Sequence, residues 1–179
     1  MSIPKSAHPV KLIVGFLSAE RNLLDEVLRI LTETYGPVDW ISSVTAFDYT
    51  EYYNRELGSN LLRRFAAFDQ LISPESLPDI KLMTNATEDQ FSTDGKRRVN
   101  IDPGYISEAH LILATGKGYT HRPYLRDGIY ADLTLVYKDK AFHTMEWTYP
   151  DYASVAMLED LKKIREKYLI QLRELKTVL

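Results

Sequence analysis

The first third of the chain alternates short apolar runs with one amphipathic segment. Lys11–Leu17 is a short apolar run of the kind that forms a central β-strand. Apolar residues at helical spacing follow it and predict a helix with Ser18 as its N-cap and Glu20 in its first turn. This helix is expected to end at Gly36-Pro37. Its apolar face consists of Leu23, Leu24, Val27, Leu28, Leu31 and Tyr35.

The next segments continue the alternation of strands and helices. Val38–Phe47 is rich in β-branched and aromatic residues and predicts a strand. Leu61–Ile72 predicts another, although the paired arginines within it are also compatible with a helix. A second helix is expected to open at Ser73-Pro74-Glu75, and Arg98–Asp102 alternates as a strand that stops before Pro103-Gly104. The order β-α-β-β-α-β is that of a ferredoxin-like antiparallel sheet with helices on one face.

The last third predicts a β-meander and a long helix. Strands are expected at His110–Thr115, Gly128–Tyr137 and Ala141–Trp147, and a helix from Asp151, its N-cap, to the end of the chain. Apolar residues at a spacing of three to four indicate that this helix covers the sheet: Leu161, Ile164, Tyr168, Leu172, Leu175 and Leu179. With no repeat or linker, residues 1–179 are predicted to form a single α+β domain. Its ferredoxin-like sheet is extended by the C-terminal β-meander and the long C-terminal helix.

Composition and charge exclude several classes of protein. The 179 residues include no cysteine, which excludes disulfides, thiolate zinc sites, iron–sulfur clusters and cysteine nucleophiles. A net charge of −3 argues against a basic nucleic-acid coat. No apolar run approaches the roughly 18–20 residues that cross a membrane, so we expect a cytoplasmic protein without membrane association.

Polar and aromatic residues gather in four segments, which are Phe47–Tyr53, Arg98–Tyr105, Gly116–Asp132 and Glu146–Tyr152. These segments hold nine of the twelve tyrosines. Tyrosine combines a large apolar body with a hydroxyl that needs a partner, so such clusters suit ligand pockets as well as the edges of cores. Residues 96–130 carry a net charge of +3 in this acidic chain, which indicates an anionic ligand such as a phosphate or carboxylate. A solvated basic edge is the alternative interpretation.

A phosphate-binding or catalytic motif of known spacing is missing. Gly116-Lys117-Gly118 does not match the G-x-x-x-x-G-K-[ST] pattern of P-loop proteins. A different phosphate site, built from loop amides with Lys117, His121 and Arg122, stays open. No serine stands in a nucleophile-elbow context, so a Ser-His-Asp triad has no support.

The candidate site combines these residues in named roles. His121 is the candidate general acid or base, oriented by Asp127 or Asp102, although a loop histidine without such a role is the simpler interpretation. The residues expected to bind the anion are Arg98, Lys117 and Arg122. The residues expected to form the walls of the pocket are Tyr105, Tyr124 and Tyr130. No cofactor is assigned. Scattered carboxylates would suit magnesium or manganese, but no histidine spacing supports zinc.

Four stretches form a specific combination, namely FDYTEYYNRELG, RRVNIDPGYIS, LATGKGYTHRPYLRDGIYADLTL and WTYPDY. In this combination the chain resembles an uncharacterised prokaryotic family, domain of unknown function 4416, over nearly its whole length. The resemblance implies a nucleotide-sized ligand, since some members carry a GTP-binding label, and it supplies no catalytic residue. This chain also lacks the guanine-reading motif N-K-x-D.

Three functions compete on this basis. The favoured one is binding of, or action on, a small anionic ligand such as a nucleotide or phosphorylated metabolite. The second is a non-enzymatic RNA-binding module, since ferredoxin-like sheets can stack bases on exposed aromatic residues. The acidic balance and the missing RNP pattern count against it. The third is a homo-oligomeric interaction module that assembles through the last turns of the C-terminal helix, Glu174–Leu179.

Overall fold

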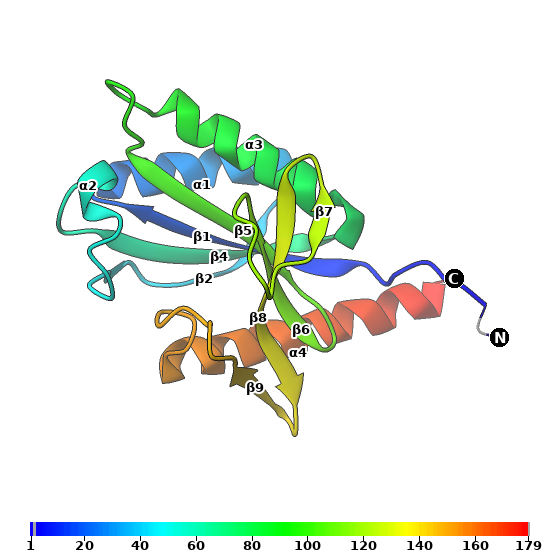
Figure 1. The fold of residues 1–179 in the computed structure, drawn as a ribbon. Helices are drawn as coiled ribbons and strands as arrows, with labels where there is room; N and C mark the ends of the chain where they lie inside the picture. Colours follow the sequence, from blue (N-terminus) through cyan, green and yellow to red (C-terminus); the bar gives the residue numbers. More distant parts are fainter. Residues whose placement is uncertain (2, 179) are drawn as a thin grey trace.

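The computed structural model describes residues 1 and 3–178, which form one antiparallel sheet with helices on both faces (Figure 1). The strands are β1 (Val10–Ser18), β2 (Val38–Ile41), β3 (Thr45–Ala46), β4 (Leu62–Ile72), β5 (Val99–Ile106), β6 (His110–Thr115), β7 (Tyr124–Arg126), β8 (Ile129–Lys138) and β9 (Ala141–Thr144). The helices are α1 (Arg21–Tyr35), α2 (Asn54–Leu57), α3 (Leu77–Gln90) and α4 (Val155–Val178), with a 3₁₀ turn at Pro74–Ser76.

The α+β class is confirmed, with an antiparallel sheet and a C-terminal helix. The ferredoxin-like topology itself is not confirmed. The sheet has nine strands in the order β2-β4-β1-β5-β6-β8-β7, with β3 beside β4 and β9 beside β8. Helices also cover both faces of this sheet rather than one, α1 and α3 on one side and α4 on the other (Figure 1).

Strand β1 lies at the centre of the sheet and is buried on both faces. Because successive side chains of a strand point to opposite faces, Leu12, Val14 and Phe16 pack with α1 and α3, whereas Ile13 packs with α4. On its two edges β1 pairs with β4 and β5, both antiparallel. Arg63 of β4 and Asp102 of β5 therefore lie on strands that flank β1 on its two edges.

Helix α4 covers the sheet as its apolar spacing predicts. Leu161, Ile164, Tyr168 and Leu172 are buried in one cluster with the sheet, whereas the next apolar residue, Leu175, is 45% exposed. The predicted position Leu179 lies outside the described residues. The part of the chain described here has no helix that is long and apolar enough to cross a membrane.

The N-cap of α4 is not Asp151. Helix α4 begins four residues later, and the hydroxyl of Ser154 accepts a hydrogen bond from the backbone N–H of Met157 (3.3 Å), which is the geometry of an N-cap. The N-cap of α1 is likewise Glu20 rather than Ser18. The Ser18 hydroxyl instead accepts from the Glu20 N–H (3.0 Å) and donates to the carbonyl of Arg98 (2.7 Å).

Three strand predictions were wrong in extent. The strand expected at Ala141–Trp147 ends at Thr144, as β9. Val38–Phe47 divides into β2 and β3, because Ser42 turns its backbone N–H and its hydroxyl to the main chain of Phe65. The strand expected to stop at Asp102 instead continues as β5 through Pro103 and Gly104 to Ile106. Gly104 permits this because β6 approaches it so closely that a Cβ there would lie 2.4 Å from the carbonyl oxygen of Ile112.

Candidate functional site

A cavity opens where β5 and β6 separate. The two strands pair only through Gly104–Ile106, so the preceding residues of β5 have a neighbouring strand, β1, on one edge alone. Helix α3 satisfies the free edge with side chains: Lys81 donates to the carbonyl of Ile101 (2.8 Å), and the Ile101 N–H donates to Glu88 (2.6 Å). The resulting cavity of about 670 Å³ lies within the range of about 300–1,000 Å³ usual for small-molecule sites.

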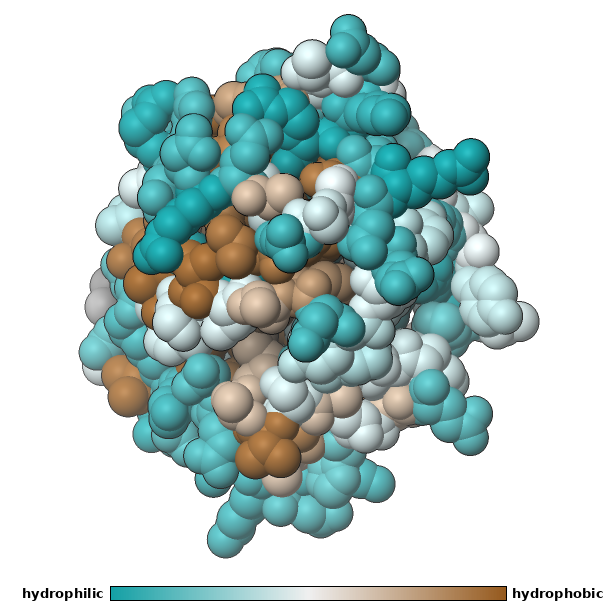
Figure 2. Space-filling model, turned by 90° about the vertical axis from the view of Figure 1, so that its left-hand side faces the viewer, coloured by the Kyte–Doolittle hydropathy of each residue, from teal (hydrophilic) through white to brown (hydrophobic). Residues whose placement is uncertain are grey.

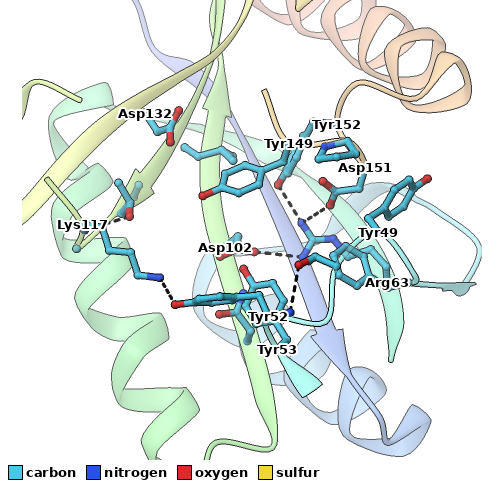
Figure 3. Close-up of a pocket in the computed structure, with 18 of the residues that line it drawn as sticks. Tyr49, Tyr52, Tyr53, Arg63, Asp102, Lys117, Asp132, Tyr149, Asp151 and Tyr152 are labelled. Carbon is cyan, nitrogen blue, oxygen red and sulfur yellow. Dashed lines mark hydrogen bonds and ion pairs between the residues drawn. The ribbon is translucent and has the colours of Figure 1, made fainter. Parts of the chain in front are cut away.

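All four polar-aromatic segments of the sequence reach this cavity. Five tyrosines line it: Tyr49, Tyr52, Tyr53, Tyr149 and Tyr152 (Figure 3). Tyr152 is buried, whereas Tyr49, Tyr52 and Tyr149 are 45–64% exposed. On the face of the molecule shown in Figure 2, hydrophobic and weakly polar side chains gather centrally among hydrophilic ones. The cavity is thus aromatic along its walls and open to solvent on one side.

Arg63 forms the buried centre of the cavity floor. It extends from β4 across Gly15 of β1, where an added Cβ would lie 2.9 Å from its Nη2. Its guanidinium reaches Asp102 on β5 (3.1 Å) and Asp151 before α4 (3.0 Å), and it donates to the Tyr152 hydroxyl (3.4 Å) (Figure 3). Three segments far apart in sequence therefore meet at one guanidinium.

The charges of this cluster are set by burial and by Arg63. Burial alone would raise the pKa of the Asp102 carboxyl, but the Arg63 guanidinium, assisted by Lys81, holds it below its usual value. Burial raises the pKa of both the Tyr53 and the Tyr152 hydroxyls. At neutral pH the cavity therefore contains an ionised carboxylate and two phenols that keep their protons.

A second cluster ties the tyrosine-bearing segment to α3. Arg97 binds both oxygens of Glu56 on α2 (2.7 Å each), one oxygen of Glu88 on α3 (2.7 Å) and the side-chain oxygen of Asn100 (3.1 Å). Burial raises the pKa of Glu88, although Lys81 and Arg97 oppose this. Bidentate arginine–carboxylate pairs have a narrow geometry, so this cluster holds α2 beside the cavity.

Lys117 is the lining cation without a carboxylate partner. Its ammonium donates to the Tyr52 hydroxyl (2.7 Å), and no carboxylate of residues 1 and 3–178 lies within 4.0 Å of it. The other cations of the wall, Arg63, Lys81 and Arg97, each lie within 4.0 Å of at least one carboxylate. An anion entering the cavity therefore finds its uncompensated positive charge at Lys117.

Asp102 and Lys117 are the two predicted site residues that line the cavity. Arg122 lies beside it and donates to three lining residues, namely the Asp132 carboxylate (2.8 Å), the Tyr149 hydroxyl (3.1 Å) and the Lys117 carbonyl (3.1 Å). His121 stacks on Trp147 with ring centroids 4.4 Å apart. The Nε2 atom of His121 lies 3.8 Å from the Asp132 carboxylate, whereas the sequence predicted Asp127 or Asp102 as its neighbour.

The other predicted residues do not line the cavity. Arg98 forms a bidentate pair with Glu20, and Asp127 is exposed and pairs with its neighbour Arg126. The three predicted wall tyrosines also lie elsewhere. Tyr124 and Tyr130 contact each other at the β7–β8 hairpin, and Tyr105, whose pKa burial raises, packs against the apolar cluster under α3.

Sequence reasoning missed Arg63, Asn100, Asp151 and Tyr152 as parts of one site. The signal for Arg63 was its parity, because it shares a face of β4 with the buried residues Phe65 and Ala67. A charged residue at an inward position of a strand implies a buried partner. In the described part of the chain, no group of three or more histidine and carboxylate side chains is placed to hold a metal ion.

Comparison with known proteins places the chain in a family without an assigned function. The family model described as "Domain of unknown function (DUF4416)" matches residues 8–168. Neither the curated proteins nor the solved structures contain a match. Because the matched range covers most of the 179 residues, the chain belongs to the DUF4416 family.

Proposed function

We propose that this protein binds a small anionic ligand of nucleotide or sugar-phosphate size in the cavity between β5 and β6. The observation that carries the proposal is Lys117, a cation on the wall of an aromatic cavity with no carboxylate within 4.0 Å among the described residues. Tyrosine faces supply contact area for the body of the ligand, and the ammonium of Lys117 supplies its counter-charge.

Binding is the function supported here, rather than a named reaction. The predicted acid or base, His121, does not line the cavity, and its ring is stacked on Trp147. The lack of cysteine supports a cytoplasmic location as part of the same proposal. The RNA-binding and oligomeric alternatives stay predictions from the sequence.

The test is thermal unfolding against a panel of nucleotides, sugar phosphates, carboxylates and divalent metals. A ligand present at about 100 times its dissociation constant stabilises the folded state by about 2.7 kcal/mol. For a domain of this size that raises the unfolding midpoint by about 5–10 °C. No shift with any member of the panel would refute the proposal.

A variant then locates the binding. Lys117→Gln removes the charge, and the dissociation constant of a bound anion, measured by calorimetry, should rise by about 10-fold or more. Lys138→Gln is the matched control, because Lys138 is an exposed lysine at the end of β8 and does not line the cavity. Equal affinities of Lys117→Gln and the wild type would place the anion elsewhere.

A further inference from the structure

The floor of the cavity holds a cluster with more negative than positive charge, the Arg63 cluster (Arg63, Asp102 and Asp151). The one guanidinium lies between the carboxylates of Asp102 (3.1 Å) and Asp151 (3.0 Å), and both carboxylates line the cavity. Among residues 1 and 3–178, neither carboxylate has a second cation within 4.0 Å. A single positive charge cannot neutralise two negative ones, so the Arg63 cluster keeps one negative charge in excess.

The other two cations of the floor do not remove this excess. The charge of Lys81 helps to keep the pKa of Asp102 low, but its ammonium lies 3.9 Å from the carboxylate of Glu88. Arg97 is bound to Glu88 and to Glu56 (2.7 Å each). Two cations are thus matched by two carboxylates of their own, and the excess stays with the Arg63 cluster.

The excess charge is open to the cavity at Asp102. Its side chain is 26% exposed and lines the cavity, whereas the side chains of Arg63 and Asp151 are nearly buried. An ionised carboxylate accepts hydrogen bonds in about four lone-pair directions, and Arg63 and Asn100 occupy only part of this capacity. A positively charged donor on a ligand can therefore bind Asp102 from within the cavity.

The tyrosine walls suit a cation as well. The face of an aromatic ring attracts positive charge within about 6 Å of its centre. The cavity already contains two such contacts, since the Lys117 ammonium lies 4.7 Å from the centre of the Tyr52 ring and the Arg63 guanidinium lies 5.6 Å from that of Tyr152. A cationic nitrogen in the cavity would thus meet both aromatic faces and the excess carboxylate charge.

The unpaired cation and the excess negative charge lie at different places in one cavity. Figure 3 shows Lys117 on one side and Asp151 on the other, with Asp102 between them. We propose that the anionic ligand also carries a cationic nitrogen, which binds at Asp102 while the anionic group binds Lys117. This deepens the proposed function and rests on it. A phosphorylated amino sugar and a phosphorylated amino acid share this chemistry.

Matched pairs of ligands test the proposal on the unchanged protein. Dissociation constants are measured by calorimetry at pH 7 for glucosamine 6-phosphate against glucose 6-phosphate, and for O-phosphoserine against 3-phosphoglycerate. Within each pair an ammonium group replaces a hydroxyl and the rest of the molecule is the same. The amine should bind at least about 10-fold more tightly than its hydroxyl counterpart, because only the amine brings a positive charge to Asp102. A preference in the first pair alone would identify an amino sugar, and in the second alone an amino acid.

Equal affinities within both pairs would overturn the inference. If that equal binding is weakened by Lys117→Gln, the proposed function stands and only the recognition of a cationic nitrogen fails. If none of the four compounds binds, the inference is also overturned, and the thermal panel decides on the proposed function separately.

Asp102→Asn tests the carboxylate directly, because it removes the charge, keeps the shape and leaves Arg63 paired with Asp151. The preference for the amine should fall by about 10-fold, while the hydroxyl compound binds at least as tightly as before. Asp25→Asn is the matched control, since Asp25 also pairs with an arginine of β4, Arg64, but lies outside the cavity. A loss of affinity that is equal for both members of a pair would contradict a charge contact. If Asp102→Asn does not fold, the comparison of ligands on the wild type still decides the question.

Discussion

Replacing Arg63 by methionine should destabilise the protein strongly, because the carboxylates of Asp102 and Asp151 would lose the guanidinium between them. The Arg63 side chain is 6% exposed, and those of Asp102 and Asp151 are 26% and 9% exposed. Removing one partner from a buried ion pair typically costs about 3–5 kcal/mol, since the remaining charge is left uncompensated. Asp102 retains some exposure, so the lower part of this range is expected.

The loss is measured as a difference in the free energy of unfolding by urea at pH 7, and as a shift in the thermal midpoint. For a chain of this size each kcal/mol moves the midpoint by about 2–4 °C, so a decrease of about 6–12 °C is expected from a loss of about 3 kcal/mol. Arg64→Met is the matched control. Arg64 is adjacent on β4 and pairs with Asp25, whose side chain is 61% exposed, and exposed pairs contribute about 0–1 kcal/mol.

The dependence on pH provides a second readout. In the wild type the pKa of Asp102 lies below its usual value, so its contribution to stability is present above about pH 3.9 and is lost as the pH falls through the lower folded-state pKa. Without Arg63, burial raises the folded-state pKa of Asp102 instead. The uncompensated Asp102 charge then destabilises the variant at neutral pH, and protonation relieves this cost as the pH falls toward about 3.9. The difference in the free energy of unfolding between variant and wild type should therefore narrow at low pH. A loss below about 1 kcal/mol at pH 7, or a gap independent of pH, would refute this reasoning.

Three further predictions concern the framework of the cavity, and urea unfolding measures each of them. Gly104→Ala should lower the free energy of unfolding by about 1–3 kcal/mol, because its Cβ would lie 2.4 Å from a backbone oxygen of β6. Gly116→Ala, with open space around it, should cost less. Equal losses in the two variants would contradict the close approach of β6. Gly15→Ala should displace the Arg63 guanidinium, 2.9 Å from the new Cβ, and the pH dependence of its stability should resemble that of Arg63→Met. Ser154→Ala should cost about 0.5–2 kcal/mol through the lost N-cap of α4, and an unchanged free energy would show that another group caps the helix.

Several elements could be predicted because their signals are local. The strand at Lys11–Leu17 lies within β1, Leu61–Ile72 corresponds to β4, and the apolar face of α1 is buried at Leu23, Leu24, Val27 and Leu31. Apolar positions recur every two residues in a strand and every 3.6 residues in a helix when one face of the element is buried. This pattern can be identified within the element's own sequence. The extent of β5 could not be predicted in this way, because Pro103 and Gly104 were interpreted as a turn. Only the approach of β6 explains why a glycine stands inside a strand.

The candidate site could likewise be predicted from the sequence only in part. Composition and spacing indicated four polar-aromatic segments, and all four contribute to the cavity wall. Within these segments the choice of residues depended on contacts that the sequence does not display. Arg122 and His121 stand in a conspicuous loop motif but are engaged by Asp132 and Trp147. Asn100 has no motif around it and still lines the cavity.

By itself, the sequence determined that polar and aromatic residues gather in these four segments, and that an α+β sheet carries them. Only the tertiary structure decided which charges neutralise one another. Arg63 pairs with Asp102, 39 residues away, and reaches Tyr152, 89 residues away, because β1 holds β4 and β5 on its two edges and α4 closes one face. A charge in a sequence pattern is equally compatible with solvent and with a buried partner. Desolvation makes these two situations differ by several kcal/mol, and only the packing of distant segments determines which one applies.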